Sequence, residues 1–437
     1  MEPALATDCV ELAGDLIAGR RYRAARRLLT AQGILSQRGH ALLGRAHLGM
    51  KDYEAALHHL GLAAERDPAD LDSLVHLARA CTASGRPHSA IRILEGLITA
   101  DPHHAPANEA LAGAYRRDAR YGDAIRLVRA AVSAGVLTGQ LLYEQAMCLH
   151  ALGNAAEALE VWDRLLEEQS DLAAGWFQSH ASALQTVSLE EALKRLRRAA
   201  DCHGANGKYW AFLAAYALFM GQEDEAARII AGPLTARPHH MALVDGVRAL
   251  LPHLAADFRL FGCSAHLLRH GVAQAGITGL VLEFGVRRGT SITHIAEAAG
   301  QPVHGFDSFE GLPEEWGSQP QGSFTTELEL PPVPGNAMLH AGWFEDTLPT
   351  FLGEHPGPVR FVNIDCDIYS STKTVLSALA GRLRPGSILV FDEFIGNQTW
   401  REHEYKAFQE FVHETGVRYE YFAACPFTRQ VAVRITA

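Results

Sequence analysis

Two groups of acidic residues near the C-terminus are the side chains of this sequence that are best suited to chemistry. Asp365 and Asp367 follow one apolar run, and Asp392 and Glu393 follow another. Three or four carboxylates at one place repel one another unless a cation or a proton offsets their charge. If the two groups meet in space, they predict a divalent metal site in an enzyme.

The residues around these acids predict how they meet. Residues 360–364 and 387–391 are apolar and read as strands, and residues 372–384 between them read as one amphipathic helix, closed by Pro385-Gly386. Strand, helix and strand in so short a span form a βαβ unit, so the strands should be parallel and adjacent. Both acidic groups then lie at the same carboxyl edge of one sheet, where open α/β sheets bind their ligands.

The same alternation extends through the C-terminal region. We expect strands at 280–284, 303–306 and 336–340, helices at 253–275, 291–299, 346–353 and 402–415, and a final antiparallel edge pair at 419–422 and 431–435. Alternating strands and helices indicate a mostly parallel, doubly wound sheet of the α/β Rossmann-like class. We assign this domain to residues 253–437.

A glycine-containing turn follows the first of these strands. Glu283, Gly285 and Gly289 form an ExGxxxG pattern, and Asp307 ends the next strand, 22 residues beyond Gly285. Glycines let the backbone approach a ligand closely, and an acid at the position of Asp307 either accepts the ribose hydroxyls of an adenosine or caps a helix. Glu283 would repel phosphates but suits a cationic ligand, which favours S-adenosylmethionine over a dinucleotide.

Residues 1–245 show a different pattern, with a period of 34 residues. Alanine recurs at this spacing, and glycine often stands five residues earlier: Ala56, Ala90, Ala124, Ala158, Ala192, Ala226, Gly85, Gly153 and Gly221. Small residues where helices cross, with glycine in the turn, resemble the tetratricopeptide repeat. Such an all-α array serves equally well as a passive scaffold or dimer interface and as a groove for a protein or peptide partner, and the sequence leaves a homo-oligomer open.

Length, net charge and cysteine content limit the number of domains, the kinds of binding partner and the cellular compartment. The 437 residues suffice for two or three domains. A net charge of −11 without a long basic run argues against nucleic acid and against an anionic membrane as partners. Seven scattered cysteines without a CxxC pair argue against a disulfide framework and for the cytoplasm. We identify neither a signal peptide nor an apolar run of about 18 residues.

Five segments of the C-terminal region together resemble a known family. They are EFGVRRGTS, GFDSFEGLPEEW, NIDCDIYSSTKTVLSALAGRLRPGS, FDEF and HEYKAFQEF. They are similar to the macrocin O-methyltransferase-like family, class I enzymes that use S-adenosylmethionine to methylate sugar hydroxyls in antibiotic biosynthesis. The resemblance covers residues 280–437. This chain has Asp-Glu where relatives commonly have Asp-Asp, and N-terminal repeats are not a usual part of these enzymes.

The resemblance also implies roles for individual residues. It implies magnesium held by Asp365, Asp392 and Glu393, with Asp365 as the general base. It implies that S-adenosylmethionine contacts Glu283, Gly285, Gly289, Thr290, Ser291, Asp307, Ser308, Phe309, Gly342, Trp343 and Phe344. For Asp367, a ligand role and a structural role stay equally open.

The sequence thus predicts a metal-dependent O-methyltransferase that acts on a hydroxylated natural product, with a sugar moiety as the acceptor. One alternative is an acceptor carried by a protein or peptide that the repeats dock, and another is a non-catalytic repeat scaffold with a vestigial methyltransferase domain. The proline-rich segment 312–335 is long for a connector, so we expect either a lid over the substrate or a disordered loop. In the first case Trp316 and Phe324 would face the substrate, and His403 and Glu404 would border the site.

Overall fold

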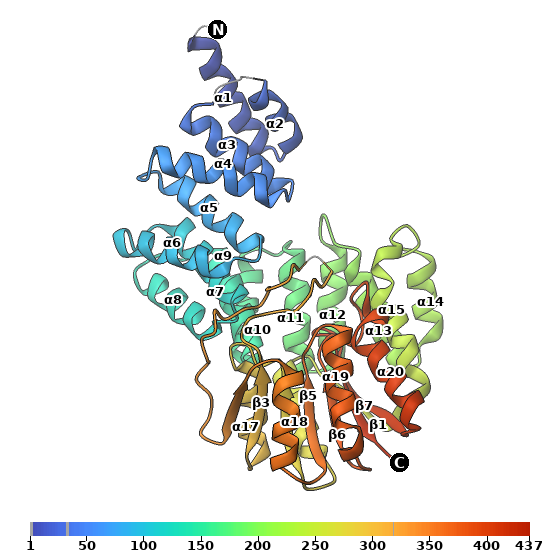
Figure 1. Ribbon diagram of the computed structural model, residues 1–437. Coiled ribbons are helices and arrows are strands. Elements are labelled where there is room, and N and C mark those ends of the chain that lie inside the picture. The colour runs from blue at the N-terminus through green and yellow to red at the C-terminus, as the bar shows by residue number, and fades with distance from the viewer. Residues whose placement is uncertain (1–2, 32–34, 318) are drawn as a thin grey trace. The chain divides into compact units, whose positions relative to one another are not determined.

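The computed structural model describes residues 3–31, 35–317 and 319–437 (Figure 1). By its internal contacts the chain divides into one unit, Met1–Cys148, and a second unit, Leu149–Ala437. The first unit is helical, and the second contains further repeat helices together with the whole sheet. The predicted order, a helical repeat array followed by an α/β domain, is confirmed. The limits 1–245 and 253–437 describe two sequence patterns and stay a prediction.

The first unit is built from consecutive helix pairs. Its helices are α1 (Pro3–Ala18), α2 (Tyr22–Thr30), α3 (Gln37–Gly49), α4 (Tyr53–Arg66), α5 (Leu71–Ala83), α6 (Pro87–Ala100), α7 (Ala105–Arg117), α8 (Tyr121–Ser133) and α9 (Gly139–Ala151), which crosses into the second unit. Ala56, Ala90 and Ala124 are each 0% exposed. A methyl group on Gly44 would lie 2.5 Å from Leu60 Cγ, so small residues do let neighbouring helices approach closely.

The same repeat continues in the second unit. Its helices are α10 (Ala155–Glu168), α11 (Ala173–Thr186), α12 (Leu189–Asp201), α13 (Lys208–Phe219), α14 (Glu223–Ala231) and α15 (Ala242–Leu250). Ala158, Ala192 and Ala226 are at most 1% exposed. Gly153 and Gly221 turn between helices at φ +82° and +69°, a backbone conformation that glycine adopts without strain. The 34-residue period therefore marks real helix crossings in both units.

The strands of the described residues form one eight-stranded sheet. They are β1 (Leu254–Leu260), β2 (Leu280–Phe284), β3 (Val303–Asp307), β4 (Ala337–Ala341), β5 (Val359–Ile364), β6 (Ile388–Phe391), β7 (Tyr419–Cys425) and β8 (Gln430–Ile435), in the order β1-β7-β8-β6-β5-β2-β3-β4. Strands β4, β3, β2, β5 and β6 pair in parallel. Strand β8 is antiparallel to both β6 and β7. The mostly parallel, doubly wound sheet is confirmed.

The expected edge pair and one expected helix differ from the structure. Residues 254–260 form strand β1 rather than the start of a helix, and helix α16 begins only at Ser264 (α16, Ser264–Gln274). Strand β1 pairs in parallel with β7, so β7 and β8 are not the edge of the sheet. The segment LAADFRL has little alternation of its own. Its strand conformation depends on the free edge of β7, which is a tertiary effect that propensity does not report.

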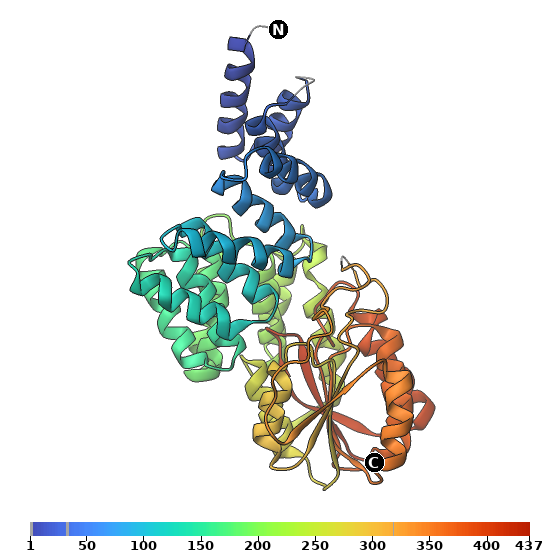
Figure 2. The same ribbon diagram turned by 60° about the vertical axis from the view of Figure 1, so that its left-hand side comes forward.

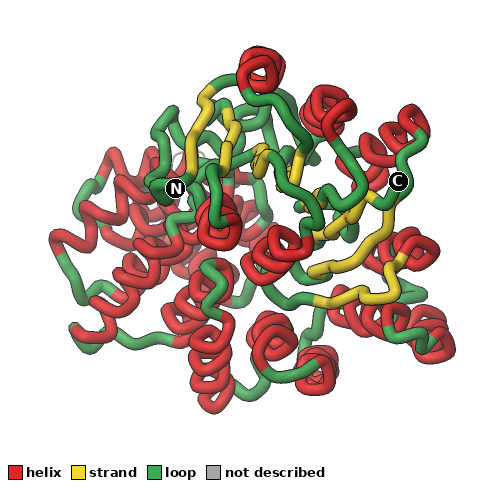
Figure 3. Tube along the Cα trace, turned by 90° about the horizontal axis from the view of Figure 1, so that it is seen from below, coloured by secondary structure: helices red, strands yellow, loops and turns green. Residues whose placement is uncertain are grey.

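Helices cover both faces of the sheet. They are α16 and α17 (Thr290–Ala299) on one face, and α18 (Phe344–Glu354), α19 (Tyr369–Leu379) and α20 (Glu404–Thr415) on the other. Figure 2 shows the yellow helices and the orange-to-red helices on opposite sides of the strands, and Figure 3 shows the strands in yellow between red helices. Two buried apolar clusters fill the two layers. Strands β5 and β6 are therefore covered on both sides, which explains their mostly apolar sequence.

The repeat helices of the second unit share a core with the sheet. One buried cluster contains Tyr216 and Val244 from the repeats together with Ile395 and Tyr421 from the α/β region. His150 at the end of α9 bonds to Ser182 at 2.8 Å and to the Gly262 carbonyl oxygen at 3.0 Å. The last repeats are therefore a structural part of the α/β unit.

Neither disulfides nor membrane spans are found in the described part of the chain. All seven cysteines are free thiols, and six of them are buried. Within residues 3–31, 35–317 and 319–437, no helix combines the length and the apolar content that crossing a bilayer requires.

The contact between α15 and the loop after β6 provides a test of this shared core. A methyl group on Gly246 would lie 2.7 Å from Ile395 Cβ. We expect Gly246→Ala to destabilise the second unit by about 1–3 kcal/mol, because a packed core resists added volume. Urea unfolding followed by tryptophan fluorescence measures this unit alone, since all six tryptophans lie between Trp162 and Trp400.

A matched control lies on helix α18 of the same unit. Gly353 is exposed and has no atom within 4 Å of the position of an added methyl group. Gly353→Ala should stabilise the unit by about 0.5–1 kcal/mol, because alanine is the better helix former. Equal effects of the two substitutions would show that α15 does not pack tightly on the loop after β6.

Candidate active site

The carboxyl ends of four neighbouring parallel strands place the predicted site residues in one row. Phe306, Phe284, Ile364 and Phe391 are register partners across β3, β2, β5 and β6. The residues that follow them are the end of β3, the glycine turn and the two acidic groups: Asp307, Gly285, Asp365 and Asp392. Backbone bonds hold this row, with the Asp365 amide donating to the Phe284 oxygen at 2.9 Å. The acids expected to meet at one edge of the sheet are thus neighbours.

Burial and mutual repulsion dominate the electrostatics of these acids. Burial, followed by the charges of Asp367 and Glu283, holds the pKa of the Asp365 carboxyl well above its usual range. Burial and the charge of Asp365 raise the pKa of Asp392 in the same direction. Burial and the charge of Asp392 likewise raise the pKa of Asp367, whose backbone lies at φ +62°, a strained conformation for an aspartate. Burial and repulsion among the carboxylates thus outweigh the charges of Arg287 and Arg429, which act to lower these pKa values.

Glu393 has a cationic partner within the protein. The Arg429 guanidinium donates to both Glu393 carboxylate oxygens, at 2.7 and 3.0 Å, and the Asn397 amide donates to Oε2 at 3.4 Å. The neighbouring Asp392 carboxylate accepts a hydrogen bond from the Gln430 side chain. Glu393 is thus held by an ion pair, whereas Asp365 and Asp392 have no basic side chain among their hydrogen-bond donors in the described part of the chain.

Glu404 brings a further buried carboxylate to these acids. Its side chain is 0% exposed, Oε2 accepts from the Glu393 amide at 3.2 Å, and Oε1 has no hydrogen-bond partner. Burial and the charge of Asp392 raise its pKa well above the usual range. The sequence predicts that Glu404 borders the site, and the structure places its carboxylate against the backbone of the acidic pair.

The glycine turn is shaped by how closely it approaches β5. Gly285 has φ +94°, and a methyl group there would collide with the Asp365 carbonyl oxygen, 1.9 Å away. Gly289 has φ +79° and immediately precedes α17, whose first turn contains Thr290 and Ser291. No residue but glycine fits at position 285, so the sequence pattern reflects a real close approach of two strand ends.

Glu283 lies at the end of β2 beneath this turn and is 0% exposed. Its Oε1 atom accepts from the Asn363 amide at 2.9 Å, and its Oε2 atom is buried without a partner. Burial raises the pKa of Glu283 to about 7, although hydrogen bonds from Ser291 and Asn363 act in the opposite direction. A buried carboxylate with a vacant acceptor atom fits a cationic group such as an ammonium.

Asp307 links the two loops that follow β2 and β3. Its carboxylate accepts from the Arg287 amide and from the Phe309 amide, each at 2.7 Å. Ser308 accepts from the Glu310 amide at 3.2 Å. The Phe309 ring is 1% exposed and packs in the core with α17. The roles of these residues toward an adenosine stay predictions, with Asp307 also serving as a loop bridge and Phe309 as a core residue.

The three residues predicted to close an adenine pocket follow β4. The Gly342 amide donates to the Asp307 carbonyl oxygen at 3.0 Å, so this turn lies directly beside the end of β3. Trp343 precedes α18 and is half-buried. The Phe344 ring meets the Phe284 ring edge to face at 5.3 Å. All three thus lie next to the row of strand ends, and their contact with a ligand stays a prediction.

Segment 312–335 packs over the glycine turn. The Arg287 guanidinium lies over the Phe324 ring at 5.1 Å, and Arg288 pairs with Glu329 at 3.2 Å. Trp316 lies 6.4 Å from Phe324 and 6.3 Å from His403, measured between ring centroids. Phe324 and Glu329 of this segment therefore lie against the two arginines of the glycine turn, and a role of the segment as a lid stays a prediction.

Some further residues of this site carry a signal in the sequence, and others carry none. Asn363 is a polar residue in the otherwise apolar run FVNI, which indicates a buried polar partner. Arg429 and Gln430 reach residues 36 and 38 positions earlier in the chain, so no local pattern connects them with the acids. Within the described residues, no three His, Cys, Asp or Glu side chains are arranged to hold a metal ion.

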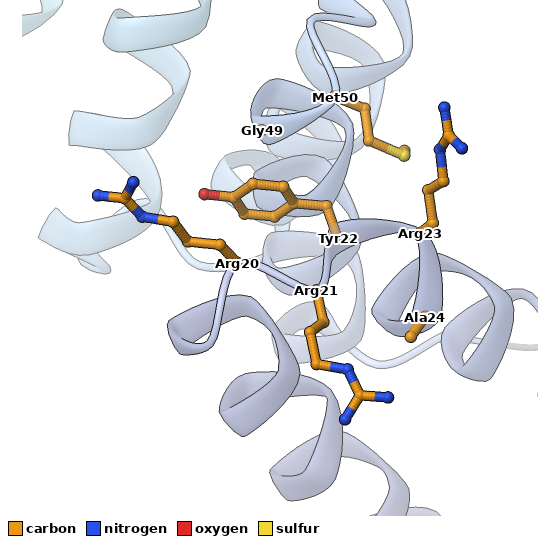
Figure 4. Close-up of a pocket in the computed structure, with 7 residues that line it drawn as sticks. All are labelled: Arg20, Arg21, Tyr22, Arg23, Ala24, Gly49 and Met50. Carbon is orange, nitrogen blue, oxygen red and sulfur yellow. The ribbon is translucent and has the colours of Figure 1, made fainter. Parts of the chain in front are cut away.

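A separate pocket lies in the first unit, between α1, α2 and the end of α3 (Figure 4). It is lined by Arg20, Arg21, Tyr22, Arg23, Ala24, Gly49 and Met50. A methyl group on Gly49 would collide with the Tyr22 ring, so this glycine lets the ring pack against α3. Figure 4 shows the three guanidinium groups pointing in different directions. The three guanidinium groups thus do not converge on one point where an anion could bind, and the lining residues include no carboxylate, histidine or cysteine.

Comparison with known proteins agrees with this geometry. A methyltransferase domain model matches residues 282–394, which run from β2 to the residue after Glu393. Tetratricopeptide repeat models match residues 47–97 and 109–174. The methyltransferase match thus covers the glycine turn and both acidic groups.

One curated relative and two solved structures illustrate the similarity. The relative is 8-demethyl-8-(2,3-dimethoxy-alpha-L-rhamnosyl)-tetracenomycin-C 4'-O-methyltransferase from Streptomyces olivaceus, 30% identical over 152 residues, which span 28% of this chain and 56% of that protein. The calicheamicin methyltransferase CalS11 is 22% identical with a TM-score of 0.32, covering 52% of this chain and 91% of that one. A thermophilic tetratricopeptide repeat protein from Thermus thermophilus is 19% identical with a TM-score of 0.39, covering 42% and 100%.

The repeat models and the methyltransferase model match different parts of the sequence, in the order that the fold shows. The curated relative is itself a methyltransferase, and the chain matches little more than half of its length. The chain therefore contains segments that match tetratricopeptide repeats, followed by a segment that matches a methyltransferase domain.

Proposed function

We propose that this protein is an S-adenosylmethionine-dependent and magnesium-dependent O-methyltransferase that acts on a hydroxyl of a natural product, with a sugar moiety as the acceptor. One observation carries the proposal: the buried carboxylate of Glu283, whose Oε2 atom has no hydrogen-bond partner, and the acids Asp365 and Asp392 lie on or directly after neighbouring strands at the same edge of the sheet. The methyl acceptor named for the curated relative, a rhamnosyl group, supports a sugar.

The glycine turn and Glu283 fit the methionine end of S-adenosylmethionine. Glu283 Oε2 is buried without a hydrogen-bond partner, and Gly285 lets the end of β2 approach the Asp365 carbonyl oxygen closely. Thr290 and Ser291 lie beside this turn in the first helical turn of α17. When bound, the sulfonium cofactor supplies an electrophilic methyl group. The protein then has to hold the acceptor hydroxyl in line with that methyl group.

The acids at the ends of β5 and β6 provide carboxylate oxygens, the kind of ligand that magnesium prefers. Magnesium prefers oxygen ligands and usually takes one or two protein carboxylates, with water and substrate at its other positions. Asp365 and Asp392 are neighbouring carboxylates with no basic side chain among the hydrogen-bond donors that the described residues provide, so they would hold the ion. Glu393 is the third candidate ligand, and it would have to leave its ion pair with Arg429. A bound magnesium ion lowers the pKa of a coordinated hydroxyl.

Asp365 is the residue best placed to remove the acceptor proton. It lies between the glycine turn at the end of β2 and Asp392 at the end of β6. In the proposed reaction Asp365 accepts the hydroxyl proton while Glu283 holds the donor's ammonium, so each acid has a separate role.

A direct assay tests this function. The full-length protein is incubated with S-adenosylmethionine and a panel of glycosylated natural products, and the S-adenosylhomocysteine released is measured with magnesium or with excess chelator. We expect a methylated sugar product that depends on magnesium. Transfer to nitrogen or sulfur acceptors only, or full transfer in chelator, would contradict the proposal.

The pKa of Glu283 predicts how cofactor affinity depends on pH. The free carboxyl has a pKa of about 7 and must be ionised to bind an ammonium, so protons compete with the ligand below that pH. We expect the Kd for S-adenosylmethionine to rise about fifteenfold in total between pH 7 and pH 5.5. Calorimetric titration across this range measures the effect.

Glu283→Gln is the control for this pH dependence. It keeps the shape and the Asn363 contact but cannot ionise, so its Kd should be weak at every pH and nearly independent of pH. Titration of the ligand itself is common to both proteins and cancels in the comparison. A wild-type Kd that is the same at pH 5.5 and pH 7 would show that Glu283 does not bind the ammonium.

A further inference from the structure

The turn between β7 and β8 connects the repeat helices with the acidic edge of the sheet. On one side, the Phe427 ring lies 6.0 Å from the Phe177 ring and 5.7 Å from the His180 ring, both on α11. On the other side, Arg429 pairs with Glu393 at 2.7 Å. The α11–α13 region of the repeats therefore lies within one short turn of the proposed active site.

Lys208, the first residue of α13, lies in this region. Its amino group stands 4.3 Å from the centroid of the Phe177 ring and 5.8 Å from that of the Tyr209 ring. The side chain is half-buried. Aromatic faces attract a cation but carry no net charge, so they leave the positive charge of the lysine unbalanced.

The neighbours of Lys208 include two arginines and a histidine. Burial and then the charge of Arg429 lower the pKa of Lys208. Burial, followed by His239, Arg237 and Lys208, lowers the pKa of His240, so its imidazole is a neutral hydrogen-bonding group. Gly207 brings them together, since a methyl group there would lie 2.5 Å from the His240 ring. We name Lys208, Arg237, His240 and Arg429 the basic cluster.

The basic cluster stands out because other lysines of the second unit have acidic partners. Lys194 pairs with Glu191 at 3.5 Å, and Lys373 pairs with Glu410 at 2.9 Å. In the part of the chain that the structure describes, no ion pair of Lys208 is found. Arg429 alone in the basic cluster has a carboxylate partner, Glu393. Like charges held together in a half-buried place favour binding of an anion.

We propose that the basic cluster binds a phosphate group carried by the methyl acceptor, with Lys208 as its main contact. This inference rests on the proposed function, because it places the charged part of the acceptor beside Glu393 and its hydroxyl beside Asp365. A phosphate has several acceptor oxygens that a lysine and an arginine can share. The repeats would then contribute directly to acceptor recognition, in addition to stabilising the sheet.

Calorimetric titration of the full-length protein tests this site without methyl donor or magnesium. The probes are hexose 1-phosphate, which represents an acceptor-linked phosphate, and inorganic phosphate. We expect hexose 1-phosphate to bind more tightly than inorganic phosphate, and Lys208→Gln to weaken its binding about tenfold, the effect of one charged hydrogen bond. Lys208→Arg should restore most of the affinity.

Lys194→Gln is the matched control, since Lys194 also lies on a repeat helix but is 79% exposed at its side chain. It should bind both probes as the wild type does. Absence of binding to the wild type, equal binding by Lys208→Gln, or equal affinity for the two probes would each overturn the proposal. Because the titration involves no methyl transfer, its failure leaves the proposed function standing, and failure of the methyl-transfer assay leaves this result unaffected.

Discussion

Asp365→Asn is expected to abolish methyl transfer while leaving the fold and the binding of S-adenosylmethionine intact. The substitution keeps the size of the side chain and removes one carboxylate at the end of β5. General-base catalysis typically contributes about 10²–10⁴-fold, so kcat should fall by at least this factor. Steady-state kinetics with the acceptor found in the product assay measure kcat, and calorimetry measures cofactor affinity.

The stability of the Asp365→Asn variant shows whether the Asp365 carboxylate has a catalytic or a structural role. Burial and the charges of Asp367 and Glu283 oppose ionisation of Asp365, as the raised pKa shows. Removing its charge relieves this repulsion, so the melting temperature should rise above that of the wild type. A structural carboxylate would show the opposite, since its removal would leave hydrogen-bond donors without a partner.

Magnesium provides a second measurement that does not depend on turnover. An ion that binds only the folded state raises the melting temperature with its concentration. We expect this rise in the wild type and not in Asp365→Asn or Asp392→Asn. Glu393→Gln should keep part of it, because Arg429 already occupies the Glu393 carboxylate.

Asp346→Asn serves as the control, because Asp346 is an acid in the first turn of α18, outside the row of strand ends. Its kcat and its response to magnesium should match those of the wild type. Full activity of Asp365→Asn, or full activity of the wild type in excess chelator, would exclude the metal-assisted proton transfer proposed here.

The acids could be predicted from the sequence because their placement follows from local patterns. Two continuous apolar runs, one helix between them and acids after each run are sufficient to specify a parallel βαβ unit. The right-handed, adjacent connection of such units then brings Asp365 and Asp392 to neighbouring strand ends. Similarly, the close approach of the Asp365 backbone requires glycine at position 285. A glycine directly after a predicted strand can be identified from the sequence, so this turn could be predicted.

Contacts between distant segments could not be predicted in the same way. Strand β1 forms because the edge of β7 is available, which no pattern in residues 254–260 reports. The ion pair between Arg429 and Glu393 forms because β8 lies beside β6. The sequence pattern predicts β8 only as part of an edge pair, so this neighbour could not be predicted. Whether Phe309 packs in the core or faces a ligand depends likewise on residues distant in the chain. The sequence around Phe309 does not distinguish the two cases.

The shared core of the second unit leads to the last prediction, which concerns truncation. A protein of residues 253–437 retains the whole sheet and every predicted site residue, yet we expect it to be unfolded or aggregated. A protein of residues 139–437, which begins with helix α9 and keeps the remaining repeats, should fold. The two differ only in helices that the sequence alone assigns to a separate domain.

The reason is the apolar surface that the repeats cover. Ile395 packs against Gly246, the Phe258 ring stacks on Phe219 at 5.2 Å, and the Phe427 ring contacts the Phe177 ring. Burying one large apolar side chain contributes about 1.5–3 kcal/mol. Exposing several of them removes an amount comparable to the whole stability of a domain, about 5–15 kcal/mol.

Size-exclusion chromatography and thermal unfolding of the two truncated proteins decide between these outcomes. The 139–437 protein should elute as a defined species, melt cooperatively and bind S-adenosylmethionine, whereas the 253–437 protein should do none of these. If residues 253–437 were monomeric and bound the cofactor, the repeats would be dispensable for the α/β fold. The active site would then be independent of them, and the contacts that α11, α13 and α15 make with the loops around Ile395 and Phe427 would be incidental to catalysis.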